Sequence, residues 1–407
     1  MIKKVIFFTV IKVCLPFVLF AQYFITPPLL VPFMSSAPEI ESRAAVMIDM
    51  ATGALLYSKN PRMEIPPASL TKLMTMHIVL NEVEAGRISL DDIVELTRES
   101  WAQSQPRGSS LMFLAPGQIV TLREIMLGMA VPSGNDAAVA AALHIASSVS
   151  EFIGMMNAEA RRMGLYTTRF SDTSGVSRRN ITTAVEYAYF ARQYITLHPY
   201  TLNDFHSVTV FSYPLAENVA PQFQARPGTI TQTNRNNLLY NFPGVDGLKT
   251  GYIPASGNNL ALTAQRGDTR FILILLGAPS VQVRDVDCTN LLEWAFANFK
   301  TVRPHVQEIE DARLWKGKEN TVQLKVEAPL DFTSPVYRSN NLFYDIVIFD
   351  PLIAPLPEGF HAGDLIISDL FGEVNRVPII TAVEYQRGNI FKRIWHSIVL
   401  LFNGNRH

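Results

Sequence analysis

Three short motifs of this 407-residue chain contain the side chains that nucleophilic catalysis needs. In the first motif, PASLTKLMT, Ser69 and Lys72 are three residues apart. A serine hydroxyl needs a base to become a nucleophile, and residues i and i+3 of a helix lie on one face. The spacing indicates a serine with its base beside it. The alternative is a serine that caps a helix, followed by a lysine in a buried structural ion pair.

Lys72 can act as a base at neutral pH only if its surroundings lower its pKa from about 10.4. The side chains around it are apolar on nearly every side of the predicted helix, which is typical of a buried helix. Burial lowers the pKa of a lysine, and a second positive charge nearby lowers it further. We therefore expect another lysine in the same cleft.

The two other motifs supply that lysine and further polar groups. Ser133-Gly134-Asn135 stands before an alanine-rich helix, and Lys249-Thr250-Gly251 leads toward a strand. A single match to one of these short motifs can occur by chance and is weak evidence alone. A second Ser-Gly-Asn at Ser256 is interpreted as a turn. All three in this order, however, form the pattern of penicillin-binding proteins and serine β-lactamases.

Hydrophobic periodicity predicts mixed helix and strand as far as residue 300. Residues 43–60 and 259–278 each indicate two strands joined by a turn. Helices are expected over residues 69–84, 121–129 and 283–299, and from residue 135 onward. Short strand-like runs separated by Pro, Gly and Asp follow, which predicts a separate small β domain.

Both ends of the chain carry membrane signals. Lys3 and Lys4 precede an apolar run to Ala21, the layout of a secretory signal peptide. Cleavage is possible after Ala21 or Ala37, and an uncleaved signal anchor is the alternative. Residues 389–404 have an aromatic apolar face flanked by basic residues, which suits a helix lying in a membrane interface. The alternative is a terminal helix that docks on the protein's own core.

Charge and cysteine content exclude some classes of protein. The 35 basic and 36 acidic residues lack the basic excess of a nucleic-acid binder. Neither Cys14 nor Cys288 has the spacing of a metal ligand. No metal or cofactor is predicted.

The chain resembles the D-alanyl-D-alanine carboxypeptidases, which are low-molecular-weight penicillin-binding proteins of the clan that includes β-lactamases and transpeptidases. The resemblance covers nearly the whole mature chain, and it rests on the stretches SRAAVMIDMATGALLYSKN, PPASLTKLMT, GSSLMFLAPGQ, SGNDAAVA, FIGMMNAEARRMGL, DGLKTGY and the C-terminal helix. It implies an α/β (α+β) transpeptidase-like domain, with an antiparallel sheet flanked by helices, followed by a small β-rich domain. The expected boundaries are a signal peptide and leader at 1–36, a serine D,D-peptidase domain at 37–300, a β-rich domain at 301–385 and an anchoring helix at 386–407.

The resemblance also implies a role for each motif residue. Ser69 would form an acyl-enzyme with a peptidoglycan stem peptide, Lys72 would take its proton, and Ser133 would pass a proton to the leaving amine. The residues expected to bind substrate are Asn135, Lys249, Thr250, Gly251, Tyr252 and Arg270. A loop containing Gly108 and Ser109 is expected to position the site for hydrolysis. Tyr252 replaces a histidine of many relatives, and the stretches at 172–184 and 200–232 match the family loosely.

The function expected from this resemblance is removal of the terminal D-alanine from stem pentapeptides, with β-lactams acylating Ser69. The implied location is the outer, periplasmic face of the cytoplasmic membrane, to which the C-terminal helix would attach. A D,D-endopeptidase and a β-lactamase are alternatives within the enzymes, and a non-catalytic peptidoglycan-binding scaffold is the alternative from another class.

Overall fold

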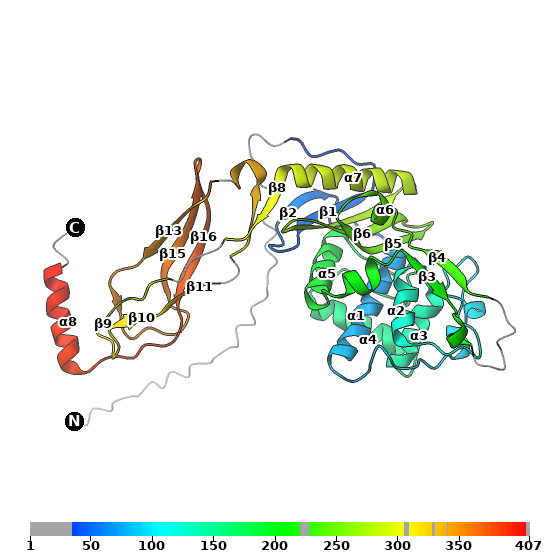
Figure 1. Ribbon diagram of the computed structural model, residues 1–407, viewed down its shortest axis with the longest axis horizontal. Helices are drawn as coiled ribbons and strands as arrows, with labels where there is room; N and C mark the ends of the chain where they lie inside the picture. Colours follow the sequence, from blue (N-terminus) through cyan, green and yellow to red (C-terminus); the bar gives the residue numbers. More distant parts are fainter. Residues whose placement is uncertain (1–34, 220–227, 305–308, 328–329, 340, 404–407) are drawn as a thin grey trace, which may run out of the picture.

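The computed structural model describes residues 35–219, 228–304, 309–327, 330–339 and 341–403. Residues 1–34 of the predicted signal peptide and leader (1–36) therefore lie outside the described residues. A five-stranded antiparallel sheet of order β2-β1-β7-β6-β5 is central to the first part (Figure 1). Its strands are β1 (Ala44–Asp49), β2 (Leu55–Lys59), β5 (Val245–Ile253), β6 (Gly257–Arg266) and β7 (Thr269–Ala278). Both predicted hairpins are confirmed.

Alternation along the strands gives the sheet two buried faces. Val46 and Ile48 of β1 pack into one hydrophobic cluster, whereas Ala45 and Met47 pack into another. The first cluster is covered by α1 (Thr71–Glu84), α2 (Leu122–Ala130), α3 (Asn135–Ile145), α4 (Val149–Arg162) and α5 (Ala184–Leu197). The second lies under α6 (Leu238–Asn241) and α7 (Val281–Asn298), on the other side of the sheet in Figure 1. The predicted antiparallel sheet flanked by helices is confirmed.

The sequence predictions located the main helices within a few residues but missed α4 and α5 as helices. The chain enters α1 through a 3-10 turn (Ala68–Leu70) that contains Ser69. Other short elements are the hairpin of β3 (Val210–Tyr213) and β4 (Ile230–Thr233), a π-helical turn (Leu202–His206), and 3-10 turns at Arg98–Ser100, Ala102–Ser104, Ala216–Asn218 and Val336–Arg338.

The C-terminal part is rich in strands and has a hydrophobic cluster of its own. β8 (Phe299–Val302) pairs with β12 (Phe332–Pro335) where the two parts meet. A four-stranded sheet follows the order β11-β16-β15-β13, and a three-stranded sheet follows the order β10-β9-β14. Their strands are β9 (Ala312–Trp315), β10 (Thr321–Val322), β11 (Leu324–Val326), β13 (Phe343–Ile348), β14 (Leu352–Ile353), β15 (His361–Asp369) and β16 (Gly372–Thr381).

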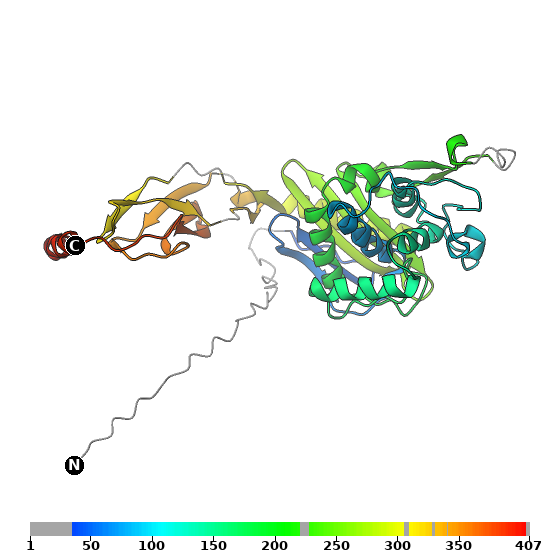
Figure 2. The same cartoon turned by 90° about the horizontal axis from the view of Figure 1, so that it is seen from below.

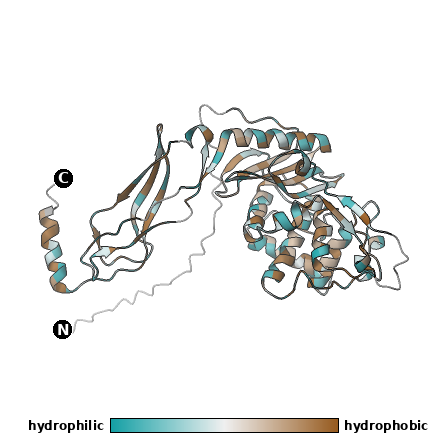
Figure 3. Cartoon of the chain, viewed as in Figure 1, coloured by the Kyte–Doolittle hydropathy of each residue, from teal (hydrophilic) through white to brown (hydrophobic). Residues whose placement is uncertain are grey.

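The last helix, α8 (Ile390–Asn403), docks through its polar face. It lies at the end of the C-terminal part that is distant from the helical layers (Figures 1 and 2). The backbone N–H of Lys316 donates to Nδ1 of His396 over 2.8 Å, and Nζ of Lys392 donates to the carbonyl of Lys318 over 2.8 Å. Phe391 and Phe402 are 80% and 76% exposed, and Figure 3 shows hydrophobic residues along this helix. The apolar face of α8 is therefore largely exposed in the part of the chain that the structure describes, which disfavours the alternative of a helix that docks on the protein's own core.

Among the described residues, no single helix is long and apolar enough to cross a bilayer. The pair formed by α3 and α4, bent by 87° between them, satisfies the length and composition test only when taken together.

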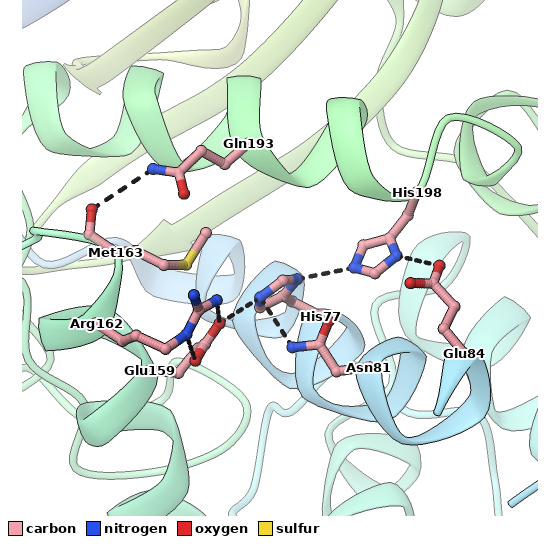
Figure 4. Close-up of polar contacts among 8 residues, drawn as sticks. All are labelled: His77, Asn81, Glu84, Glu159, Arg162, Met163, Gln193 and His198. Carbon is pink, nitrogen blue, oxygen red and sulfur yellow. Dashed lines mark hydrogen bonds and ion pairs between the residues drawn. The ribbon is translucent and has the colours of Figure 1, made fainter. Parts of the chain in front are cut away.

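Hydrogen bonds of two buried histidines, His77 and His198, hold the C-terminal half of α1 (Figure 4). Nδ1 of His77 lies 2.9 Å from Nε2 of His198, and Nε2 of His77 lies 2.8 Å from a carboxylate oxygen of Glu159 on α4. Nδ1 of His198 in turn contacts Glu84, at the end of α1, over 2.6 Å. These contacts join α1 to α4 and to the end of α5, so the C-terminal half of the helix that follows Ser69 is held in place.

Two buried histidines should make the fold sensitive to acid. Burial lowers the pKa of His198, and burial together with the charge of Lys249 lowers the pKa of His206 to about 3. Each binds fewer protons in the folded chain than in the unfolded chain, so stability is lost as the pH falls below about 6.5. We expect His206 to remove about 1.4 kcal/mol from the free energy of unfolding between pH 7.5 and 5.5, and His198 to lower it further in the same direction.

Urea unfolding of wild type and of His206→Gln at both pH values measures this loss. The variant should lose about 1.4 kcal/mol less than wild type over the same interval, whatever its stability at pH 7.5. An unchanged pH dependence in the variant contradicts the assignment.

Candidate active site

Close backbone packing presents Ser69 at the surface of the fold. Ala68 has φ +52°, and Ser69 follows it within the 3-10 turn. A Cβ on Gly251 of β5 would lie 3.0 Å from the nitrogen of Ser69, and one on Gly175 would lie 1.8 Å from the carbonyl oxygen of Ala68. Because backbone approaches from both sides, only glycine fits at these two positions. The glycine of the third motif is thus a requirement of packing.

The side chain of Ser69 does not cap the helix, which excludes the structural alternative for this serine. Neither the 3-10 turn nor α1 has a side-chain capping bond at its start. Instead, Oγ of Ser69 lies 3.2 Å from Nζ of Lys72. The first motif therefore brings a hydroxyl and an amine into contact.

Lys72 is fully buried, and its amine has two further partners. Nζ donates to Oδ1 of Asn135 and to the carbonyl of Ser174, each over 2.7 Å. A neutral amine has two N–H bonds and one lone pair. When the two N–H bonds are directed at Asn135 and Ser174, the lone pair is left for the hydroxyl of Ser69.

Burial supplies the pKa that a base needs. It lowers the pKa of Lys72 to about 7, against the opposing effect of Asp172 and Asp136 and with a smaller contribution from Arg235. Lys249 is the second lysine that the sequence led us to expect. Burial holds the pKa of Lys249 well below its ordinary value, and the charge of Lys72 lowers it further. Protonation of both buried amines, Lys72 and Lys249, is unfavourable because the two positive charges repel each other.

Ser133 is held beside the nucleophile in a strained conformation. Its φ is +66°, which is uncommon for a residue other than glycine. Its Oγ is buried and has no hydrogen-bond partner among the described residues. A buried hydroxyl without a partner is costly, and residues held in sparsely populated backbone conformations concentrate at functional sites.

A cleft extends to both sides of Ser69, and we name its two halves by one residue each. The Thr250 pocket has a volume of about 440 Å³ and is lined by Ser69, Gly108, Ser110, Ser133, Arg235, Thr250, Gly251, Tyr252, Asn258, Val281 and Arg284. The Arg178 pocket has a volume of about 560 Å³ and is lined by Ser69, Pro106, Arg107, Gly108, Ser109, Ser110, Asn135, Gly175, Val176, Arg178, Tyr252, Ile253, Pro254 and Ala255. Neither lining contains a carboxylate.

The structure does not place Arg270, which was expected to bind substrate, in the lining of either pocket. Arg270 pairs with Gln265 near the turn of the β6–β7 hairpin, whereas Thr250 pairs with Leu260 farther along β6. Five residues of strand separate the two levels, or about 17 Å. The guanidinium of Arg270 forms an ion pair with Asp246 over 2.8 Å.

Arg235 and Arg284 are the arginines that line the Thr250 pocket, and the sequence did not single them out. Arg235 donates to Oγ of Ser110 over 2.7 Å, and Arg284 pairs with Asp285 over 2.6 Å. Arg284 begins the second turn of α7, and Arg235 follows β4, so both are distant from the three motifs in sequence. Only the fold reveals that they face Ser69.

The loop at Gly108 and Ser109 borders the cleft. Gly108 has φ +80°, in the left-handed region, and belongs to both pockets. The carbonyl of Ser110 accepts a hydrogen bond of 2.8 Å from the N–H of Asn135, which attaches the loop to the second motif. Among the described residues, no group of three His, Cys, Asp or Glu side chains is arranged to hold a metal ion.

Comparison with known proteins identifies one family. The family model described as D-alanyl-D-alanine carboxypeptidase matches residues 32–280. The chain is 32% identical to the D-alanyl-D-alanine carboxypeptidase DacC of Escherichia coli, over 90% of each chain. Penicillin binding protein 5 from Haemophilus influenzae has a similar structure, with a TM-score of 0.75 and 29% identity over 87% of this chain and 100% of the other. Penicillin binding protein 6B from Escherichia coli gives a TM-score of 0.68 and 30% identity over 86% and 98%.

The pKa of Lys72 predicts how the reactivity of Ser69 depends on pH. The neutral amine is the active form, so acylation of Ser69 by a fluorescent penicillin should slow about tenfold per pH unit below about pH 7. The rate should level off above about pH 8. Rates from pH 5 to 9 measure this profile, and a rate that stays flat down to pH 5 contradicts the role of Lys72. Lys72→Arg should lose labelling, because a guanidinium stays protonated.

Proposed function

The chain belongs to the D-alanyl-D-alanine carboxypeptidase family, and on this premise we propose that it removes the terminal D-alanine from peptidoglycan stem pentapeptides. The observation that carries the proposal is the contact of 3.2 Å between Oγ of Ser69 and Nζ of Lys72. Lys72 is buried, has a pKa near 7 and has acceptors for its N–H bonds. It can therefore take the proton of Ser69 as Oγ attacks.

In the first half of the reaction, Oγ of Ser69 bonds to the carbonyl carbon between the two terminal D-alanines. The developing oxyanion accepts hydrogen bonds from the backbone N–H groups of Ser69 and Tyr252. The close approach of Gly251 to the nitrogen of Ser69 supports this pairing. The C–N bond then breaks, and the free hydroxyl of Ser133 passes a proton from Lys72 to the departing amine.

The Thr250 pocket suits the carboxylate of the leaving D-alanine. Thr250 offers a hydroxyl at its wall, and Arg235 supplies positive charge, whereas the charge of Arg284 is balanced by its ion pair with Asp285. Lys249, the residue that precedes Thr250 on β5, is buried and adds positive potential when it is protonated. We assign Asn135 to the substrate amide as well as to Lys72.

Water must then release the acyl-enzyme. Because no carboxylate lines either pocket, we assign the base of this step to Lys72, which is neutral again after the proton has left through Ser133. Gly108 and Ser109 border the space beside Ser69, and we propose that they shape it for the attacking water.

Turnover on a defined pentapeptide ending in D-Ala-D-Ala tests this function. Wild type should release free D-alanine and leave a tetrapeptide, as measured by product mass, and Ser69→Ala should reduce the rate below detection because the nucleophile is lost. Cleavage of cross-linked dimers alone would instead identify a D,D-endopeptidase. Penicillin labelling that survives in Ser69→Ala would contradict the nucleophile assignment.

We further propose that α8 attaches the protein to the outer face of the cytoplasmic membrane. In support, its apolar side chains are exposed while its polar face is occupied by the β-rich part. Exposed aromatic side chains with Lys392 and Arg393 nearby are typical of interfacial helices. We assign residues 37–300 to the peptidase domain and 301–385 to a β-rich spacer between it and the membrane.

Truncation separates attachment from catalysis. Processed protein that ends at Gly388 should no longer sediment with anionic vesicles, whereas its kcat/KM on the pentapeptide should stay within about twofold of wild type. Trp395→Ser with Phe402→Ser should weaken sedimentation in the same direction, because about 0.8 kcal/mol is lost per CH₂ group that leaves the membrane. Truncated protein that still binds vesicles contradicts the assignment.

A further inference from the structure

The Arg178 pocket contains two arginines whose charge is not neutralised within the fold. Arg107 and Arg178 are both exposed at its rim. Neither guanidinium has an ion pair or a side-chain hydrogen bond among the described residues. The net charge of the whole chain is only −1, yet two unpaired positive charges lie on one side of Ser69.

The carboxylate closest in sequence to Arg178 is occupied elsewhere. Asp172 accepts hydrogen bonds from the backbone N–H groups of Ser174 and Ser177, at 2.8 and 2.7 Å, and from the side chain of Asn180, at 3.1 Å. These bonds close the loop from residue 171 to residue 180 on itself. Asp172 stabilises the loop, and Arg178 remains free to bind a ligand.

The position of this pocket shows which part of a substrate it would receive. With the D-alanine carboxylate in the Thr250 pocket, the scissile bond lies at Ser69, next to Gly251. The rest of the peptide then extends along the continuation of β5, where Tyr252, Ile253, Pro254 and Ala255 form one wall of the Arg178 pocket. This wall faces the part of the stem peptide that precedes the two D-alanines.

We propose that Arg178, with Arg107, binds a second carboxylate of the stem peptide, on the amino-terminal side of the scissile bond. This inference rests on the proposed function and assigns specificity to the same site. An arginine pairs with a carboxylate through two parallel hydrogen bonds. Two positions of a stem peptide can supply the group: the side chain of a diaminopimelate third residue, and the free α-carboxylate of a γ-linked D-glutamate second residue.

Three peptides ending in D-Ala-D-Ala distinguish these sources. The neutral reference is Nα,Nε-diacetyl-L-lysyl-D-alanyl-D-alanine. The diaminopimelate peptide has diaminopimelate at position 3 of the stem and D-isoglutamine at position 2. The glutamate peptide has Nε-acetyl-lysine at position 3 and D-glutamate at position 2. D-Alanine release by the full mature chain in detergent gives kcat/KM for each.

Wild type should prefer one of the two anionic peptides over the neutral peptide by about fivefold, the upper end for an exposed ion pair. The preferred peptide identifies the source of the carboxylate. Arg178→Gln should bring this ratio close to one, whereas Arg179→Gln should retain it, because the neighbouring Arg179 is exposed but does not line the pocket. Added NaCl should also reduce the ratio, since exposed charges are screened.

Equal kcat/KM on all three peptides in wild type overturns the inference, and so does a ratio that Arg178→Gln leaves unchanged. Failure of the proposed function has a different signature. In that case wild type releases no D-alanine even from the neutral peptide, and the inference falls with it.

Discussion

The burial of Lys72 is the constraint on which the site depends. An ammonium removed from water is costly, and burial accordingly lowers the pKa of Lys72 to about 7, so that a large share of the amine is neutral near that pH. A buried neutral amine still needs acceptors for its N–H bonds, and Asn135 and Ser174 provide them from two different segments. The second motif and the loop at residues 171–180 therefore serve the same lysine. Because Lys249 is buried nearby, protonation of one amine opposes protonation of the other.

The sequence was sufficient for residues whose role follows from local spacing. Ser69 and Lys72 lie one turn apart on a helix, and the strand pairs follow from alternation, so the motifs and the central hairpins were predictable. Arg270 shows the limit. It lies on a predicted strand of the correct hairpin, but the sequence does not say which end of that hairpin reaches the nucleophile. The register of β5, β6 and β7 decides this, and it places Arg270 at the other end. Arg235 and Arg284 were missed for the same reason, since only tertiary packing brings them to Ser69.

Helix α8 illustrates a second limit of pattern alone. Its periodicity predicted an amphipathic helix, but periodicity does not tell which face meets the rest of the protein. The contacts of His396 and Lys392 decide that it is the polar face. Helices α4 and α5 were not predicted, because no catalytic motif drew attention to their sequences. In the structure, their buried faces pack against α1 and the sheet.

The loop at residues 171–180 joins two properties that could otherwise vary separately. Its carbonyl at Ser174 accepts a hydrogen bond from Lys72, the proposed base, and Arg178 on the same short turn lines the pocket that we propose receives the substrate. Asp172 fixes both through one carboxylate. A change in peptide preference that altered the backbone of this turn would also disturb proton transfer. Substitutions that change peptide preference are therefore expected at exposed side chains such as Arg178 and Val176. Substitutions of Asp172 or Gly175 would alter the backbone of the turn and are expected to be poorly tolerated.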